Sequence, residues 1–183
     1  MTEETKLNDL KFQLFDPKED SKNKLPNSLG NYIIVLRETA TLPDAKIKPI
    51  YTTYNGYNVI YTGISSKNLR DRDYEQHFTG NNAGRSTLRK SLGCLFGYKQ
   101  IPRDEKNLTN GKTKFEEKDE KELSNWMQEN LLVFFLSGTQ KNTVEKLEEF
   151  LIKEFNPPLN IQKNKDGQNK EYVKMLKSIR NNK

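Results

Sequence analysis

Three short apolar runs constrain the fold of this chain most, because each has the length and composition of one buried strand. They read NYIIVL at 31–36, NVIYTGI at 58–64 and LLVFFL at 131–136. Strands usually span roughly 3–10 residues and are rich in Val, Ile, Tyr and Phe. Segments with helical spacing lie between and after these runs. The sequence therefore predicts an α/β (α+β) fold, with a small, mostly antiparallel central sheet of about three strands flanked by helices.

The polar segments divide the 183 residues into one domain and two ends. Residues 1–28 show no sustained period, so we expect a loosely held N-terminal arm with a short helix near 7–15. Residues 29–162 form the expected domain, with polar insertions near 37–58 and 102–120. Residues 163–183 are expected to form a basic C-terminal tail with the composition of a helix.

The charge balance is basic, with 31 Lys and Arg against 25 Asp and Glu. This excess indicates a polyanionic partner, nucleic acid before an acidic membrane surface. No run approaches the roughly 20 apolar residues that cross a bilayer, and the N-terminus lacks a signal-peptide pattern, so we expect no membrane partner. The single Cys94 fits a reducing, cytoplasmic location. Because His77 is the only histidine, oxygen atoms would hold any metal, which favours Mg²⁺.

The helix expected over 143–155 carries a carboxylate on its apolar side. At about 100° per residue, Glu148 falls inside the apolar arc, between Phe155 and Ile152. A carboxylate buried there must be paired, hydrogen-bonded or bound to a metal, because burying a bare charge is very costly. Glu148 is therefore either a metal ligand or a side chain that reaches solvent or pairs with an arginine at the core edge.

The helix expected after the second strand, over 67–78, carries Arg70, Arg72 and His77. A guanidinium donates two parallel hydrogen bonds and keeps its charge, so an arginine at this junction is suited to holding a phosphate. The alternative is a solvated helix face on which these arginines pair with the acidic residues beside them.

Together these features resemble the GIY-YIG nuclease superfamily, over about residues 30–160. The matching positions are Gly30-Asn31-Tyr32, Tyr61-Thr62-Gly63, Glu148 and Asn160. The resemblance implies a nuclease that cuts DNA with one divalent metal ion. The motif tyrosines are 29 positions apart, and this long separation is similar to that of free-standing, restriction-type members.

Roles for individual residues follow from the resemblance. The two tyrosines would converge on one phosphate, one accepting a proton from the attacking water and the other orienting it; we favour Tyr32 over Tyr61 as the base. Glu148 would hold Mg²⁺ or Mn²⁺. Gly30, Gly63 and Asn160 would support the site.

Two cationic positions depart from the family pattern. A lysine often follows the second motif, but this chain has Ile64 there, so Lys67 is expected to substitute. Counting from Leu69 selects Arg72 as the family's arginine, with Leu69 packed inward. On an α-helix, however, His77 would share a face with Arg70, and the usual spacing of four from the arginine would fall on a glutamine. Arg70 therefore remains the alternative.

A further cationic cluster lies at an expected helix start near residue 86. Its cations and hydroxyls are suited to DNA phosphates, although a solvated surface would have the same composition. The expected DNA-binding residues are Arg85, Ser86, Thr87, Arg89 and Lys90. The basic tail could extend this surface.

The sequence thus predicts a Mg²⁺-dependent DNA endonuclease of restriction or defence type. A structure-specific repair or mobile-element nuclease is an alternative, as is a catalytically silent nucleic-acid-binding module of the same fold. A basic structural protein would leave Glu148 unexplained. Cutting both strands with one active site per chain would favour a homodimer.

Overall fold

A five-stranded antiparallel sheet forms the centre of the computed structural model, which describes residues 7, 10–104, 106, 111–164 and 167–181. The strand order is β1-β7-β2-β4-β3. The strands are β1 (Gln13–Phe15), β2 (Gly30–Leu36), β3 (Thr53–Tyr54), β4 (Tyr57–Ser65) and β7 (Leu131–Ser137). The expected strands are the three central ones, β2, β4 and β7. The sheet has five strands rather than about three because two short edge strands extend it.

Strand β2 is buried along its whole length, which explains its unbroken apolar run. Its alternate residues enter two separate cores. Tyr32 and Ile34 pack in one core, and Ile33 and Val35 in the other. A strand covered on both faces has no polar side, so period-two alternation disappears from its sequence.

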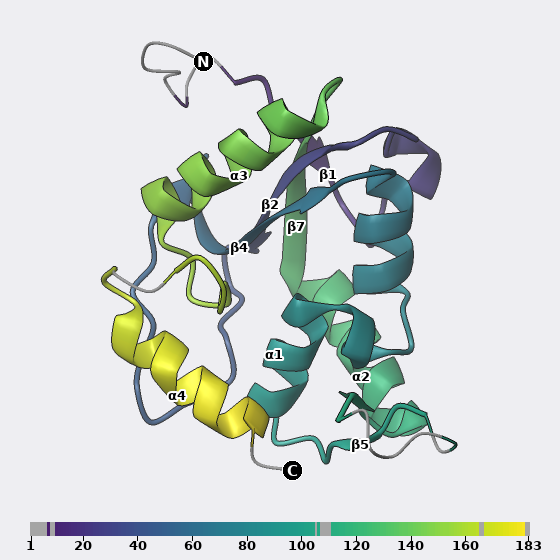
Figure 1. Cartoon of the computed structure of the whole chain (residues 1–183), viewed down its shortest axis with the longest axis vertical. Coiled ribbons are helices and arrows are strands. Elements are labelled where there is room, and N and C mark those ends of the chain that lie inside the picture. The colour runs from purple at the N-terminus through teal and green to yellow at the C-terminus, as the bar shows by residue number, and fades with distance from the viewer. Residues whose placement is uncertain (1–6, 8–9, 105, 107–110, 165–166, 182–183) are drawn as a thin grey trace.

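Helices cover both faces of this sheet. Helix α3 (Lys141–Phe155) packs on one face through Leu147, Leu151 and Phe155. The opposite core takes in the remaining helices (Figure 1). These are the π-helix η3 (Arg70–Phe78), α1 (Thr87–Leu95), α2 (Glu117–Asn130) and α4 (Lys170–Asn181).

Short elements complete the chain. Two 3₁₀ turns, η2 (Lys22–Lys24) and η4 (Ala83–Arg85), precede β2 and α1. Strands β5 (Ile101–Pro102) and β6 (Thr113–Lys114) pair within the expected insertion at 102–120, of which 105 and 107–110 lie outside the described residues. Among the described residues, none of the helices has the length and apolar character to span a bilayer.

The segment expected to be a loose arm contributes to the sheet. Residues 13–15 form strand β1, which pairs antiparallel with β7, so the helix expected near 7–15 is wrong there. Phe15 and Leu25 are fully buried. Phe15 and Leu25 therefore belong to the main core.

The C-terminal segment is also integrated. Helix α4 packs against α1, with Tyr172 and Leu176 buried. Asn169 fixes the preceding loop to the long 37–52 connection, because its side chain accepts from the Ile50 amide at 2.9 Å and donates to the Ile50 carbonyl at 2.8 Å. Figure 1 shows α4 beside this connection.

Candidate active site

The two motif tyrosines lie on adjacent strands of the sheet. Tyr32 pairs with Gly63, and Ile34 pairs with Tyr61, so the two tyrosines project from the same face. Their rings stack with centroids 6.3 Å apart. Any side chain at Gly63 would collide with the phenol of Tyr32. The glycine of the second motif therefore makes room for the tyrosine of the first.

His77 joins Tyr32 to the start of α1. Its Nε2 lies 2.9 Å from the Tyr32 hydroxyl, and its Nδ1 lies 2.7 Å from the Ser86 hydroxyl. Ser86 also accepts the Arg89 amide at 3.1 Å and so caps α1. His77 is fully buried, and burial together with the charges of Arg72 and Arg89 holds its pKa well below 6.5. The imidazole is therefore neutral at neutral pH.

The π-helical geometry of η3 determines which arginine lies near Tyr32 and His77. Hydrogen bonds in a π-helix join residues five apart, as when the Thr79 amide donates to the Tyr74 carbonyl. Residues 72 and 77 therefore share a face, and Arg72 Nε lies 3.4 Å from the Tyr32 hydroxyl. The expectation that His77 would share a face with Arg70 is wrong because it assumed an α-helix.

The two arginines have different partners. Arg70 donates through Nε and one terminal nitrogen to the Leu25 carbonyl, at 3.2 and 3.0 Å. Arg72 also donates to Gln76 at 2.9 Å and to the Arg85 carbonyl at 3.2 Å. The structure thus brings Arg72 to the tyrosines and ties Arg70 to the N-terminal segment.

Tyr61 is buried, with 7% of its surface exposed. Burial raises its pKa above 10 and the charge of Glu148 adds to this, although Arg72 and Arg180 act in the opposite direction. Tyr61 therefore keeps its proton at neutral pH and is a hydrogen-bond donor.

Glu148 lies beside Tyr61 at a cavity of about 80 Å³. Its side chain is 16% exposed, and Lys163 Nζ lies 2.9 Å from Oε2. The cation that pairs with Glu148 is thus a lysine from the tail and not an arginine at the core edge. The cavity is also lined by Thr87, Ile152, Asn160, Ile161 and Gln162.

Asn160 connects the segment after α3 to β4. Its side chain accepts from the Thr62 amide and donates to the Thr62 carbonyl, both at 2.9 Å. This pair of bonds fixes the end of α3 against the strand that carries Tyr61, so Asn160 helps to place Glu148 beside that tyrosine.

The donor set at Glu148 suits a hard cation with few protein ligands. Among the described residues, no three or more His, Cys, Asp or Glu side chains gather as a metal site. Mg²⁺ commonly binds one or two carboxylates and completes its shell with water and substrate phosphates. One partly exposed carboxylate, now paired with an ammonium, fits that kind of site.

Two expected DNA-binding residues are buried. Ser86 is 1% exposed and holds His77, while Arg89 is 0% exposed and lies 2.6 Å from Glu120. Neither side chain can reach a duplex, so this part of the prediction is corrected. Arg89 also donates to the His77 carbonyl at 2.8 Å, which makes it a support of the site.

The other expected cationic residues lie nearer the surface. Arg85 is exposed, Lys90 is half-buried with Nζ 2.6 Å from the Thr113 hydroxyl, and Thr87 lines the cavity of Glu148. Lys67 is exposed in a pocket of about 300 Å³ that Arg72 also lines.

A comparison with protein-family models supports a nuclease function. Residues 30–182 match the family model described as the GIY-YIG catalytic domain, and the chain therefore belongs to the GIY-YIG family. The match extends through α4, beyond the residues that carry the sequence resemblance. Nucleases of this family generally use divalent metal ions. No curated protein and no solved structure matches the chain at a significant level.

Proposed function

We propose that this chain is a divalent-metal-dependent endonuclease that hydrolyses a phosphodiester bond of DNA. One observation carries the proposal: Tyr32, His77 and Arg72 form a hydrogen-bonded group beside Tyr61, which in turn lines the cavity of Glu148. These elements come from distant parts of the chain, and their convergence gives a proton acceptor, a phosphate-binding cation and a metal-binding carboxylate at one place.

Tyr32 is proposed as the group that accepts the proton of the attacking water. If the Ser86 hydroxyl donates to Nδ1 of His77, the neutral ring carries its hydrogen on Nε2, facing the Tyr32 oxygen. Arg72 Nε–H is a second donor to that oxygen. Two N–H donors would stabilise negative charge on this oxygen, and a phenolate formed there would accept the proton of the attacking water. Tyr61, held in its protonated form, orients the phosphate or the water.

Arg72 has two tasks in this proposal. It covers the hydroxyl of the fully buried Tyr32, so its movement toward a phosphate would open Tyr32 to water. Its guanidinium would then stabilise the charge that develops on the phosphate oxygens. A divalent ion on Glu148 would supply Lewis-acid polarisation of the phosphate and stabilise the leaving oxygen.

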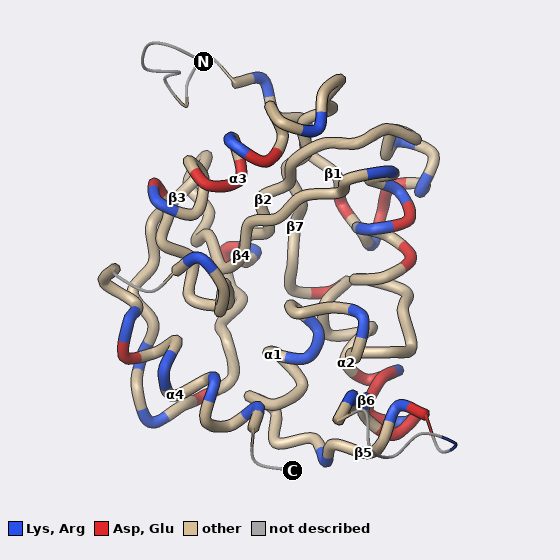
Figure 2. The backbone as a smooth tube through the Cα atoms, in the orientation of Figure 1, with Lys and Arg blue, Asp and Glu red and all other residues tan. Residues whose placement is uncertain are grey.

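DNA is proposed as the substrate because exposed cations lie beside the site and along α4. Lys67 and Arg85 line pockets on the two sides of Gln76, a partner of Arg72. Figure 2 shows further Lys and Arg residues along α4. These are exposed Lys170, Lys174 and Lys177. Binding through several such cations would weaken steeply with salt.

The test is cleavage of plasmid DNA with Mg²⁺ or Mn²⁺, comparing the native chain with Glu148→Gln and Glu149→Gln. Glu149 is the matched control, since its side chain is 66% exposed on the same helix. Loss of cleavage in Glu148→Gln alone, with DNA binding retained, would support the proposal. Full cleavage by Glu148→Gln would overturn the metal assignment.

We also propose the biological role of this nuclease. The long stretch between the motifs supports a restriction or defence enzyme, which would give discrete fragments from plasmid DNA. The single Cys94 fits a cytoplasmic location for it. Nicking confined to branched DNA would support a repair or mobile-element nuclease instead. A homodimer is expected if both strands are cut in one binding event, and the mass of the DNA complex would show it.

A further inference from the structure

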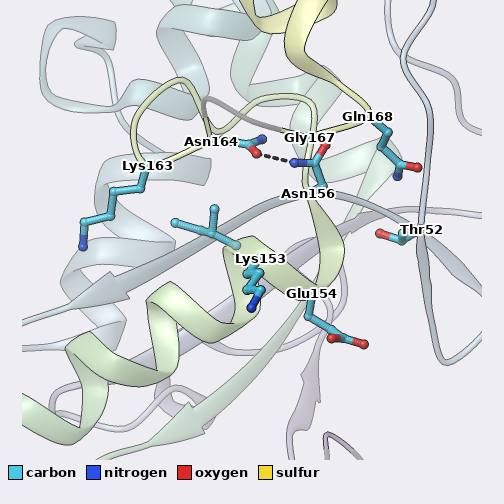
Figure 3. A pocket seen from close by; sticks show the side chains of 9 residues that line it. Thr52, Lys153, Glu154, Asn156, Lys163, Asn164, Gly167 and Gln168 are labelled. Carbon is cyan, nitrogen blue, oxygen red and sulfur yellow. Dashed lines mark hydrogen bonds between the residues drawn. The ribbon is translucent and has the colours of Figure 1, made fainter.

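Lys163 lies between two cavities and belongs to both. It lines the 80 Å³ cavity with Tyr61 and Glu148, and also a pocket of about 620 Å³ on its other side. Figure 3 shows this pocket, with Lys163 projecting from the loop after α3 and Lys153 from the end of the helix. The pocket is also lined by Thr52, Ile152, Glu154, Asn156, Asn164, Gly167 and Gln168.

The backbone of Lys163 is held in place by its neighbours. Its φ of 57° is left-handed, a conformation that a residue with a Cβ adopts only when the surroundings impose it. Asn164, which is 4% exposed, donates to the Pro157 carbonyl at 2.8 Å and accepts from the Asn156 side chain. Asn156 in turn accepts the Asn169 amide at 2.9 Å. Lys163 therefore lies in a loop whose conformation is fixed by these hydrogen bonds.

The ammonium of Lys163 forms an ion pair with Glu148, the carboxylate that is proposed to bind the metal ion. Nζ lies 2.9 Å from Glu148 Oε2 and 3.5 Å from Glu149 Oε1. The lysine side chain is 48% exposed, so it can leave toward solvent or the larger pocket, whereas Glu148 is 16% exposed and cannot follow it. A divalent ion on the same oxygen would repel the ammonium and take its place.

We infer that Lys163 is the counterion exchanged for the divalent metal at Glu148, and that the released ammonium then binds a DNA phosphate in the adjoining pocket. This inference rests on the proposed function. Lys153 gives the pocket a second cation, and in Figure 3 Glu154 lies toward Thr52, away from Lys163.

Coupling between metal and DNA follows from the exchange. Metal binding releases Lys163 for the phosphate, and a phosphate that holds Lys163 leaves Glu148 open to metal. The two ligands must strengthen each other by the same factor, because a binding coupling is reciprocal. If Lys163 only neutralised Glu148, it would weaken metal binding but would not change the affinity for DNA.

The first measurement is Mn²⁺ binding to the protein without DNA, followed by electron paramagnetic resonance. Lys163→Met should bind Mn²⁺ roughly two- to fivefold tighter than the native chain, the fold-change that a partly exposed ion pair gives. Lys153→Met, which removes the other pocket lysine, should leave Mn²⁺ affinity unchanged. Unchanged affinity in Lys163→Met would overturn the exchange.

The second measurement is the affinity for a short duplex, by fluorescence anisotropy with and without Ca²⁺. The native chain should bind the duplex tighter with Ca²⁺, and Lys163→Met should lose most of that gain. An equal gain in both proteins would overturn the phosphate role. Glu148→Gln separates the proposed metal site from the proposed exchange. Mn²⁺ binding that survives this change would contradict the metal site itself. Loss of Mn²⁺ binding would support the metal site, and the Lys163→Met results would then decide the exchange.

Discussion

The Tyr32 hydroxyl and Nε2 of His77 lie 2.9 Å apart, and both side chains are fully buried. The other ring nitrogen contacts Ser86, and the charges of Arg72 and Arg89 lie near enough to disfavour a cationic ring. The structure therefore places a neutral imidazole against a phenol, shielded from bulk water, at the point where the two sequence motifs meet.

We predict that stability falls with acid because of His77. Its folded pKa lies well below 6.5, while the unfolded chain returns to about 6.5. Below that pH the unfolded state binds more protons, so the free energy of unfolding falls by up to about 1.4 kcal/mol per pH unit. Denaturant unfolding between pH 7 and pH 5.5 measures this slope. Because the chain has one histidine, His77→Gln should flatten it, and an unchanged slope would contradict the assignment.

Substitutions of Arg72 and Arg70 should have different effects, the first on the cleavage rate and the second on stability. Arg72→Ala removes the guanidinium from Tyr32 and should slow cleavage about a hundredfold or more. Arg70→Ala loses hydrogen bonds to the Leu25 carbonyl and should cost about 1 kcal/mol of stability, with cleavage retained. Cleavage rates and denaturant midpoints of both variants decide the matter. The reverse pattern would make Arg70 the functional arginine.

Arg89 and Arg85 form a second contrast, close in sequence but opposite in burial. Arg89→Ala leaves Glu120 buried without its cation, which should cost about 3–5 kcal/mol of unfolding free energy. Arg85→Ala changes an exposed side chain, so we expect native stability and weaker DNA binding with a shallower salt dependence. A stable Arg89→Ala protein with impaired DNA binding would restore the original expectation.

Gly63→Ala should lower the cleavage rate because it displaces Tyr32. The added methyl group would occupy the space of the phenol, and the ring would have to shift away from His77 and Arg72. Displacements of about 1 Å at a reacting group can cost about a hundredfold in rate. Gly56→Ala is the control for general effects of a side chain at glycine, since the β3–β4 turn has open space around it although its φ of 84° is left-handed. Equal cleavage by both variants would argue against the Tyr32 geometry.

The centre of the sheet could be predicted because β2, β4 and β7 are long enough to produce continuous apolar runs. The edge strands β1 and β3 could not, since they comprise three and two residues and depend on pairing with their neighbours. The partial burial of Glu148 was predictable from its helical position alone. The actual partner of Glu148 was not, because Lys163 lies 15 positions away in a loop with a left-handed backbone, which no local sequence pattern predicts.

Arg89 shows where composition misled the prediction. A cation near a helix start favours a surface role, but Arg89 lies beside buried Leu88 and Leu92. The signal that could have revealed it is Glu120, an acid on the same helix as buried Leu123 and Met127. Two oppositely charged residues on apolar faces indicate a buried pair, but only the tertiary fold shows that those faces meet.

The wide turn of η3 has a consequence for the sequences of other members of this family. It lets Arg72 and His77 lie five positions apart, where the family resemblance implied four, while both groups still contact Tyr32. The wider winding thus takes up the extra position without moving either group away from Tyr32. Homologues aligned on a rigid spacing would seem to lack one of the two groups, so the interval between them should be allowed to vary when relatives are sought.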